Sequence, residues 1–267
     1  MINSKRTDLM KEEILLISDL HVMSYWGLIH PEYVAKDIRT GKRDVQYVMN
    51  EPQTFSWDHW QDMARQCRNV SAILVNGDVI DGVNRHNVGA VCNNDPMEQC
   101  KMSAMLLEML PNDVPMYVTK GTGYHSGDEF IAEQVVSELL DISYADEGII
   151  EECGIRIFAN HYSPHAQYKA AALERKINQV AAAEKYYGKI DVLVRSHNHA
   201  FSATMTTDHL AVMTPGWQHK TPYAIDKDLI TPSDIGYVKL IIEDNQLITV
   251  DRRGVVKSPF CCQVMKW

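Results

Sequence analysis

The sequence predicts an α/β protein. Short runs rich in Ile, Leu and Val each end in a polar cluster, and segments with apolar residues at three- and four-residue intervals alternate with them. Alternation of strand-like and helix-like segments is typical of α/β folds. Open α/β sheets place their chemistry at the carboxyl ends of their strands. We therefore expect the polar clusters to converge in space.

Polar clusters, a proline or a glycine mark the ends of the predicted elements. The strands that end in polar clusters are residues 13–17, 71–75, 116–119, 155–159 and 191–194. Helical periodicity covers 97–110, before Pro111, and 167–187, before Gly188. Beyond His199, the strand-like segments 209–213, 237–243 and 247–251 predict a second, mainly antiparallel sheet, with a turn at 244–246 between the last two.

The chain is predicted to form one domain, residues 1–267. No internal repeat or linker-like stretch divides it. The segment 22–69 is rich in aromatic and polar residues, and we interpret it as a loop-plus-helix insertion near the functional site.

Composition excludes several classes of protein. With 45% hydrophobic and 23% charged residues, 14 Gly and 10 Pro, the chain is neither collagen-like nor of low complexity. No apolar run approaches the roughly 18 residues of a membrane span, and the polar N-terminus lacks a signal-peptide core, so we expect a cytoplasmic location. The net charge of -9 disfavours binding to long duplex DNA. Six cysteines without CxxC spacing are interpreted as reduced thiols.

Metal-binding side chains gather at the ends of the predicted strands. They occur as Asp19-x-His21, Gly77-Asp78-x-x-Asp81, His161 and His197-x-His199. A carboxylate can bridge two cations while imidazoles fill the other positions, and such mixed oxygen and nitrogen ligands suit Mn, Fe, Zn or Ni. Any one of these triplets arises by chance, but several in order, each after a strand, predict a metal site.

The motifs resemble those of the calcineurin-like metallophosphoesterases, whose signature is DxH, GDxxD, GNH(D/E), H and GHxH in that order. The resemblance covers about residues 12–216. It implies a four-layer α/β/β/α sandwich with two packed mixed sheets, and two divalent metal ions, with Mn favoured. The stretches 195–199 and 215–218 are similar to phage-borne members of the family, which would place the protein in a host cytoplasm.

The resemblance also implies a role for each matched residue. Asp81 corresponds to a supporting residue that orients a ligand or holds its loop. The ligands of the first metal would be Asp19, His21 and His199, the bridging ligand Asp78, and the ligands of the second metal His161 and His197.

The third motif departs from the family pattern. Where the family has GNH, this chain has Gly121-Thr122-Gly123-Tyr124-His125, without the Asn ligand. Either Thr122 or water can supply the missing oxygen, and His125 is the candidate for the catalytic imidazole. The alternative is that His125 lies in a flexible Gly-rich turn and only one metal binds firmly.

Residues near the motifs are further candidates. Asn84, Arg85 and His86 follow the second motif and either contact a substrate phosphate or belong to a solvated loop. Trp217 either stacks on a base or caps the site, or is an ordinary core residue. His165 is a candidate replacement for the missing ligand.

The resemblance implies hydrolysis of a phosphate ester, most specifically a phosphodiester in a nucleotide or nucleic-acid end. A hydroxide that bridges two metals would attack phosphorus, and His125 would donate a proton to the leaving oxygen. A phosphomonoesterase or protein phosphatase, or a catalytically weak scaffold of the same fold, is the alternative. The expected partner is a small phosphorylated substrate or a nucleic-acid end, with no membrane; the oligomeric state is left open.

Overall fold

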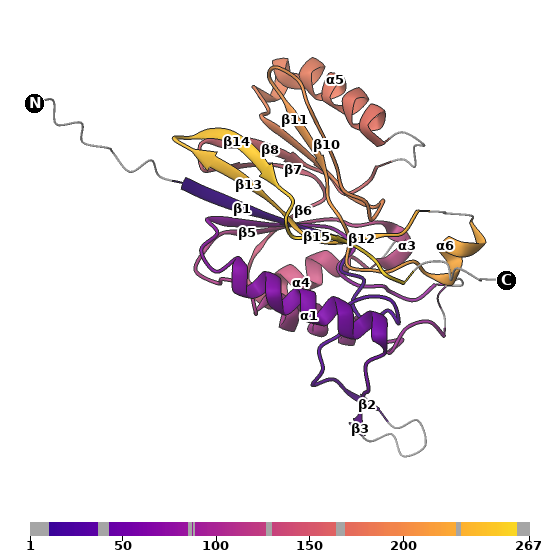
Figure 1. Cartoon of the computed structure of the whole chain (residues 1–267). Coiled ribbons are helices and arrows are strands. Elements are labelled where there is room, and N and C mark those ends of the chain that lie inside the picture. Colours follow the sequence, from indigo (N-terminus) through magenta and orange to yellow (C-terminus); the bar gives the residue numbers. More distant parts are fainter. Residues whose placement is uncertain are drawn as a thin grey trace, which may run out of the picture.

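Two β-sheets lie face to face at the centre of the molecule (Figure 1). The computed structural model describes residues 11–36, 43–84, 87, 89–126, 130–163, 169–227 and 231–260. The first sheet has the strand order β14 (Gln246–Asp251), β13 (Val238–Glu243), β1 (Lys11–Ile17), β4 (Ala72–Asn76), β5 (Met116–Thr119), β6 (Ser143–Ala145). The second has the order β10 (Ser202–Met205), β11 (Leu210–Met213), β9 (Val192–Arg195), β8 (Ile155–Ala159), β7 (Gly148–Glu152).

Both sheets are mixed. In the first, β1, β4, β5 and β6 are parallel, whereas β13 and β14 run antiparallel to their neighbours. In the second, β8, β9 and β11 are parallel, and β7 and β10 are antiparallel edge strands. The strands that precede the predicted ligands are therefore parallel to one another within each sheet, so their carboxyl ends lie at one edge.

The alternation of side chains along β1 builds two separate cores. Ile14 and Leu16 point into the layer between the sheets, where they join residues of β8, β9 and β13. Leu15 and Ile17 point to the opposite face and join the core beneath the helices. Because successive side chains of a strand face opposite sides, a strand that is apolar on both faces belongs inside a layered structure.

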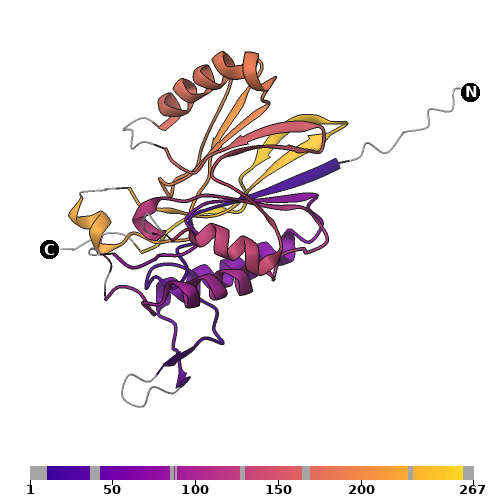
Figure 2. The same ribbon diagram turned by 180° about the vertical axis from the view of Figure 1, so that it is seen from behind.

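Helices cover the outer faces of both sheets (Figure 2). The first sheet packs against α1 (Glu51–Gln66), α2 (Pro96–Leu107) and α4 (Ala132–Leu140), which contribute Trp60, Leu106 and Val136 to its core. The second packs against α5 (Lys169–Tyr187) through Leu173 and Ile177. The predicted four-layer sandwich is thus confirmed. Within the ranges described, no helix has the length and apolarity that crossing a bilayer requires.

The prediction of a separate antiparallel sheet after His199 is wrong. β13 and β14 extend the first sheet beside β1, with Leu16 opposite Val238, while β11 and β10 extend the second sheet beside β9. Periodicity identifies a strand but not its partner. Here Val238, Leu240 and Ile242 complete the core between the sheets, and that burial selects the edge next to β1.

The segment 22–69 contains a hairpin and a core helix. β2 (Val34–Lys36) and β3 (Arg43–Gln46) form a hairpin that projects from the body of the molecule (Figure 1). The helix α1 begins at a capping box in which Asn50 and Gln53 each accept a hydrogen bond from the other's backbone N–H. It buries Trp57, Trp60 and Met63, so it is part of the outer helical layer.

Candidate metal centre

The loops after β1 and β4 bring Asp19 next to Asp78. They continue the parallel pairing of the two strands, since the N–H of Asp19 donates to the carbonyl of Gly77 (3.0 Å) and the N–H of His21 donates to that of Asp78 (3.1 Å). Residues 59 positions apart in sequence therefore lie side by side because their strands are neighbours in the first sheet.

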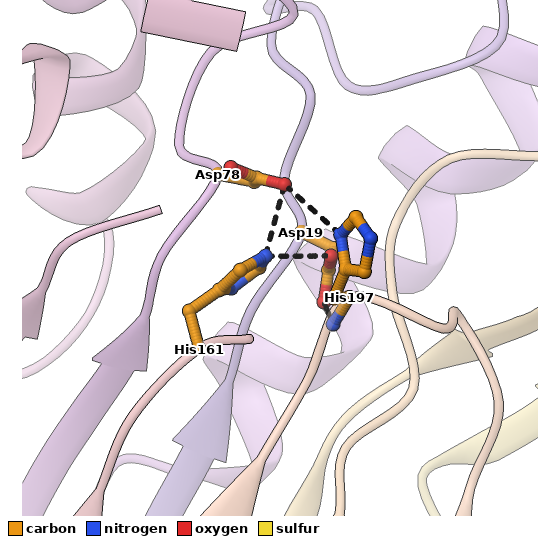
Figure 3. A group of neighbouring side chains, drawn as sticks. All are labelled: Asp19, Asp78, His161 and His197. Atoms are coloured by element: carbon orange, nitrogen blue, oxygen red, sulfur yellow. Dashed lines mark hydrogen bonds and ion pairs between the residues drawn. The ribbon is translucent and has the colours of Figure 1, made fainter. Parts of the chain in front are cut away.

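The second sheet supplies histidines that face these carboxylates (Figure 3). His161, after β8, places Nε2 2.9 Å from Oδ2 of Asp78 and 3.7 Å from Oδ1 of Asp19. His197, after β9, places Nδ1 3.9 Å from the same Asp78 oxygen. On the other side of Asp19, Nε2 of His199 lies 3.4 Å and Nε2 of His21 3.9 Å from Oδ1. The structure thus brings together all six residues that the sequence marks as ligands.

The backbone at this cluster is unusual. Five of the six residues have a positive φ: Asp19 (51°), His21 (43°), Asp78 (52°), His197 (75°) and His199 (44°). Residues with a Cβ seldom adopt this conformation, which costs about 1 kcal/mol or more each. Such strain gathers at functional sites, where the surrounding structure enforces a geometry that the local sequence does not prefer.

Each carboxylate has one anchored oxygen and one that faces the cluster. Oδ2 of Asp19 accepts hydrogen bonds from the Ser18 hydroxyl (2.6 Å) and the N–H of His197 (3.2 Å). Oδ1 of Asp78 accepts from the N–H (2.6 Å) and hydroxyl (3.1 Å) of Thr122. The remaining oxygens, Oδ1 of Asp19 and Oδ2 of Asp78, point at the imidazoles.

Three of the histidines are held by one ring nitrogen and present the other. Nδ1 of His161 donates to the carbonyl of Asn76 (2.5 Å), Nδ1 of His199 to that of Gln218 (3.3 Å), and Nδ1 of His21 to the carboxylate of Asp81 (3.2 Å). In each ring Nε2 is turned into the cluster. This is the arrangement that orients imidazole ligands of metals in proteins.

Three overlapping groups of side chains could each hold an ion, and two of them are made of the six predicted ligands; the third is His21, Asp81 and His125. Of the two made of predicted ligands, one consists of Asp19, Asp78, His161 and His197, and the other of Asp19, His21 and His199. Within each group the atoms lie within 4.8 Å of one another. The resemblance gives the shared carboxylate to Asp78, whereas in this structure Asp19 belongs to both groups of predicted ligands.

The donor set fits divalent cations. Buried Oδ1 of Asp19 makes no hydrogen bond within the part of the chain described, and buried Nε2 of His161 faces only the carboxylate oxygens of Asp78 and Asp19, which are themselves candidate ligands. Nε2 of His21 lies 3.0 Å from Nε2 of His199, a contact between two nitrogens that can both act as ligands. Because burying unpaired polar atoms is costly, a cation among them would satisfy atoms that the protein leaves unsatisfied.

The carboxylates and imidazoles of the cluster compensate one another's charge. Burial disfavours the charged form of His161, but Asp78 and Asp19 prevail and raise its pKa to about 10. Burial and the neighbouring His125 lower the pKa of His21 to about 4. Despite burial, the adjacent His161 and His199 hold the pKa of Asp19 well below its usual range. The two carboxylates are thus ionised and available as ligands.

The third motif closes over Asp78. The backbone of Gly121 packs so tightly that a Cβ there would lie 2.3 Å from Oδ1 of Asp78. The Thr122 hydroxyl donates to the carboxylate, so this residue positions Asp78. His125, in α3 (Gly123–Ser126), donates from Nδ1 to the carbonyl of Asp81 (2.8 Å) and places Nε2 3.8 Å from Oδ2 of Asp78.

Asp81 lies beside the cluster and contacts several of its neighbours. In addition to its contact with His21, its carboxylate accepts hydrogen bonds from the side-chain amides of Gln218 (2.8 Å) and Asn87 (3.1 Å). The side chain of Asn84 donates to the carbonyl of Tyr124 (3.3 Å), so it supports the segment that carries His125. Arg85, His86 and His165 lie outside the described residues.

Trp217 is not a surface for a substrate base. Its side chain is fully buried and packs edge-on against Trp60, with ring centroids 4.9 Å apart. Its contribution to the site comes from the backbone, because its N–H donates to the carbonyl of Asp19 (2.8 Å). Of the two interpretations of Trp217, the structure therefore supports the core residue and not the stacking or capping residue.

A buried polar layer beneath the ligands escaped sequence reasoning. Side-chain hydrogen bonds in this layer join the two sheets. Thr214 contacts both Ser18 (2.6 Å) and Ser196 (2.7 Å), and Asn76 contacts both Ser196 (2.6 Å) and Thr119 (2.6 Å). These residues end or follow buried strands, where a polar side chain needs a partner. A Ser, Thr or Asn at the end of an apolar strand was therefore the sequence signal that could have identified this layer.

Glu133 was also missed, and Gln218 was noted only as part of the stretch 215–218. Glu133, on α4, is buried, and burial together with Asp78 raises its pKa. Its carboxylate accepts from the N–H of Val79 (3.3 Å) next to Asp78. Gln218 supports two ligands, His199 through its carbonyl and His21 through Asp81. Glu133 belongs to no motif, and for both residues only burial and contacts next to the candidate ligands reveal what the side chain supports.

Comparison with known proteins finds solved structures of low sequence identity and low TM-score. No protein-family model and no curated protein match the chain. Among solved structures it is similar to a predicted phosphoesterase from Streptococcus pneumoniae (12% identity, TM-score 0.43, 94% of this chain and 95% of that chain covered). It is also similar to Vps29 complexed with zinc from Entamoeba histolytica (15%, 0.44, 88% and 88%) and to an archaeal phosphodiesterase (12%, 0.43, 88% and 99%). At this identity and TM-score, the likenesses decide nothing about activity.

Proposed function

We propose that the chain is a metal-dependent hydrolase of phosphate esters, and specifically a phosphodiesterase that acts on a nucleotide or a nucleic-acid end. The observation that carries this proposal is the pair of ligand groups that share Asp19 and lie at the carboxyl ends of the strands of both sheets. Paired divalent cations are a recurrent device for displacement at phosphorus. An acidic protein with ionised buried aspartates would repel a phosphate unless cations intervened.

The two groups would divide the metal ions between them. One ion would be bound by Asp19, Asp78, His161 and His197. The other ion would be bound by Asp19, His21 and His199, and with only three protein ligands it would keep more coordination positions open for water or substrate. Carboxylate and imidazole donors suit Mn, and we propose it as the native ion. Once bound, the cations would supply Lewis acidity and a lowered pKa of water.

His125 is the proposed general acid. Its Nδ1 is fixed on the carbonyl of Asp81, so Nε2 is the atom that faces the cluster and can hold a proton for the leaving oxygen. The side chain of His125 is 12% exposed, that of His197 27% and that of His199 18%, whereas those of Asp19 and His161 are buried. A substrate would therefore approach over these three histidines.

Two substitutions test the proposal. Asp78→Asn should lower bound metal below one equivalent and abolish turnover, because it removes a charge from the ligand set. His125→Asn should keep the metal and lower kcat by roughly 10²- to 10⁴-fold, the usual contribution of a general acid. Asp208→Asn, at an exposed turn, is the matched control and should change neither. Metal content and hydrolysis of bis(p-nitrophenyl) phosphate with Mn are the measurements.

The same assay separates the alternatives. Faster hydrolysis of p-nitrophenyl phosphate than of the diester would indicate a phosphomonoesterase or protein phosphatase. Less than one metal ion per chain after Mn supplementation, with no nitrophenol released from either ester, would favour a scaffold. Full turnover in His125→Asn would remove that residue from the mechanism.

A further inference from the structure

Three half-exposed tyrosines surround the candidate metal centre. Tyr124 on α3 is 42% exposed, Tyr223 on α6 (Pro222–Asp226) 39%, and Tyr162, just after His161, 58%. We call these three residues the aromatic rim. Large aromatic side chains that gather at the surface mark binding sites more often than chance exposure does.

Two residues of the rim contact site histidines. The ring of Tyr124 lies 5.1 Å from that of His125, and the ring of Tyr162 lies 5.5 Å from that of His197. Both histidines place a nitrogen within 3.9 Å of the same oxygen, Oδ2 of Asp78. The rim therefore flanks the place where the reacting phosphate would lie, with Tyr124 on the side of His125 and Tyr162 on the side of His197.

Tyr124 belongs to a composite aromatic surface. Its ring and that of Tyr223 have centroids 6.1 Å apart and planes inclined by only 33°. The Lys227 ammonium lies 5.6 Å from the centroid of Tyr223, which adds a positive charge next to the two rings. The carbonyl of Tyr124 accepts from Asn84, so its backbone is held in place. α3 and α6 are neighbours in both views (Figures 1 and 2).

We propose that Tyr124, together with Tyr223, is the stacking surface for the base of the leaving nucleoside in a nucleotide phosphodiester. This inference rests on the proposed function. A proton from Nε2 of His125 goes to the leaving oxygen, so the group attached to that oxygen lies on the side of His125 and hence of Tyr124. A base offers a flat π-face that stacks on tyrosine irrespective of sequence, which suits an enzyme for nucleic-acid ends.

The experiment compares two diesters that leave through the same ribose hydroxyl and differ in whether the leaving ribose carries a base. One is a dinucleoside monophosphate; the other replaces the leaving nucleoside with an abasic ribose. Wild-type protein with Mn should have a KM about 10-fold lower for the first, and Tyr124→Ala should raise that KM about 10-fold, in line with base–aromatic stacking. The KM for the abasic diester should change far less, and any change in kcat that arises from the contact of Tyr124 with His125 should be the same for both diesters.

Matched variants complete the test. Tyr124→Phe keeps the ring and should retain the wild-type KM values, while Tyr223→Ala should reproduce part of the effect. Tyr186→Ala, on the opposite layer of the molecule at 75% exposure, is the control for loss of an exposed tyrosine and should change neither KM.

Each contrary result has a distinct meaning. If wild-type protein hydrolyses neither diester, the proposed function fails. If it hydrolyses both with equal KM, or if Tyr124→Ala raises both KM values equally, stacking of the leaving base is wrong. A third diester, abasic on the retained side, tests the other assignment: if this diester and not the first abasic one has the raised KM, the base belongs next to Tyr162, and the assignment to Tyr124 is overturned.

Discussion

At the residue scale, Asp78 shows how a functional side chain is positioned by neighbours that carry no chemistry of their own. Thr122 donates two hydrogen bonds to its carboxylate, and Gly121 leaves room for that approach. The sequence identifies Asp78 by its motif and Gly121-Thr122 by their departure from the family pattern. Only the structure shows that Thr122 donates hydrogen bonds to this carboxylate, because the contact joins the loops that follow two different strands, β4 and β5.

Gly121→Ala should disrupt the metal centre. A Cβ would lie 2.3 Å from Oδ1 and 2.4 Å from the backbone N of Asp78, both far inside contact distance. We expect bound Mn to fall below one equivalent and the free energy of unfolding to drop by about 1–3 kcal/mol, as for other overpacked sites. Elemental analysis and urea unfolding are the measurements.

Gly148→Ala is the matched control. Its Cβ would meet only Cβ of Ala145, at 3.6 Å, so metal content and stability should stay close to those of the wild type. Normal metal content in Gly121→Ala would show that the loop after β5 can move without losing the site.

At the scale of elements, α1 shows what periodicity predicts and what it leaves open. Helical structure within 22–69 was expected, and the capping signal at Asn50 with Gln53 is readable from the sequence. The richness of this segment in aromatic and polar residues favours a loop-plus-helix insertion near the site. Trp60 packs against Trp217, more than 150 residues away in the sequence, so only the packing shows that α1 belongs to the core.

Trp60→Ala should destabilise the whole domain. Trp60 is fully buried between the first sheet and Trp217, and truncation of such a side chain costs about 3–5 kcal/mol in free energy of unfolding. Tyr186→Ala on α5 should change it by less than about 0.5 kcal/mol. Urea unfolding followed by tryptophan fluorescence and by circular dichroism measures both. A loss below about 1 kcal/mol would mean that α1 is a peripheral insertion.

At the scale of the whole molecule, His219 joins three distant parts of the chain. Its ring contacts the Ser56 hydroxyl (3.0 Å) and the carbonyl of Pro52 (3.1 Å) at α1, and the hydroxyl of Ser258 (2.7 Å) near the last described strand, β15 (Val255–Lys257). Its N–H donates to the carbonyl of Trp26 (2.7 Å). Burial lowers the pKa of His219 to about 4, so the ring is neutral at pH 7.

This burial predicts a loss of stability in acid. The unfolded chain protonates His219 near its ordinary pKa of about 6.5, whereas the folded protein does not until about pH 4. The contribution of His219 is therefore complete above about pH 6.5 and declines by about 2–3 kcal/mol as the pH falls toward 4. His219→Gln cannot titrate, so its stability deficit relative to the wild type should shrink between pH 7 and about 4.5.

Urea unfolding of the two metal-free proteins at both pH values measures that difference. Protonation of the aspartates and other histidines affects both proteins alike and cancels in the comparison. A deficit that stays constant with pH would show that the buried ring of His219 is not the source of the acid sensitivity.

By itself, the sequence indicated which residues are candidate metal ligands and which strands precede them, because ligand motifs and apolar periodicity are properties of short segments. It also determined the layered α/β class through the alternation of strands and helices. The tertiary structure decided the rest: that β13 and β14 lie beside β1, that Trp217 is core, and that Asp19 is the carboxylate common to both ligand groups. Those outcomes depend on burial and on contacts between segments far apart in the chain, which local pattern does not encode.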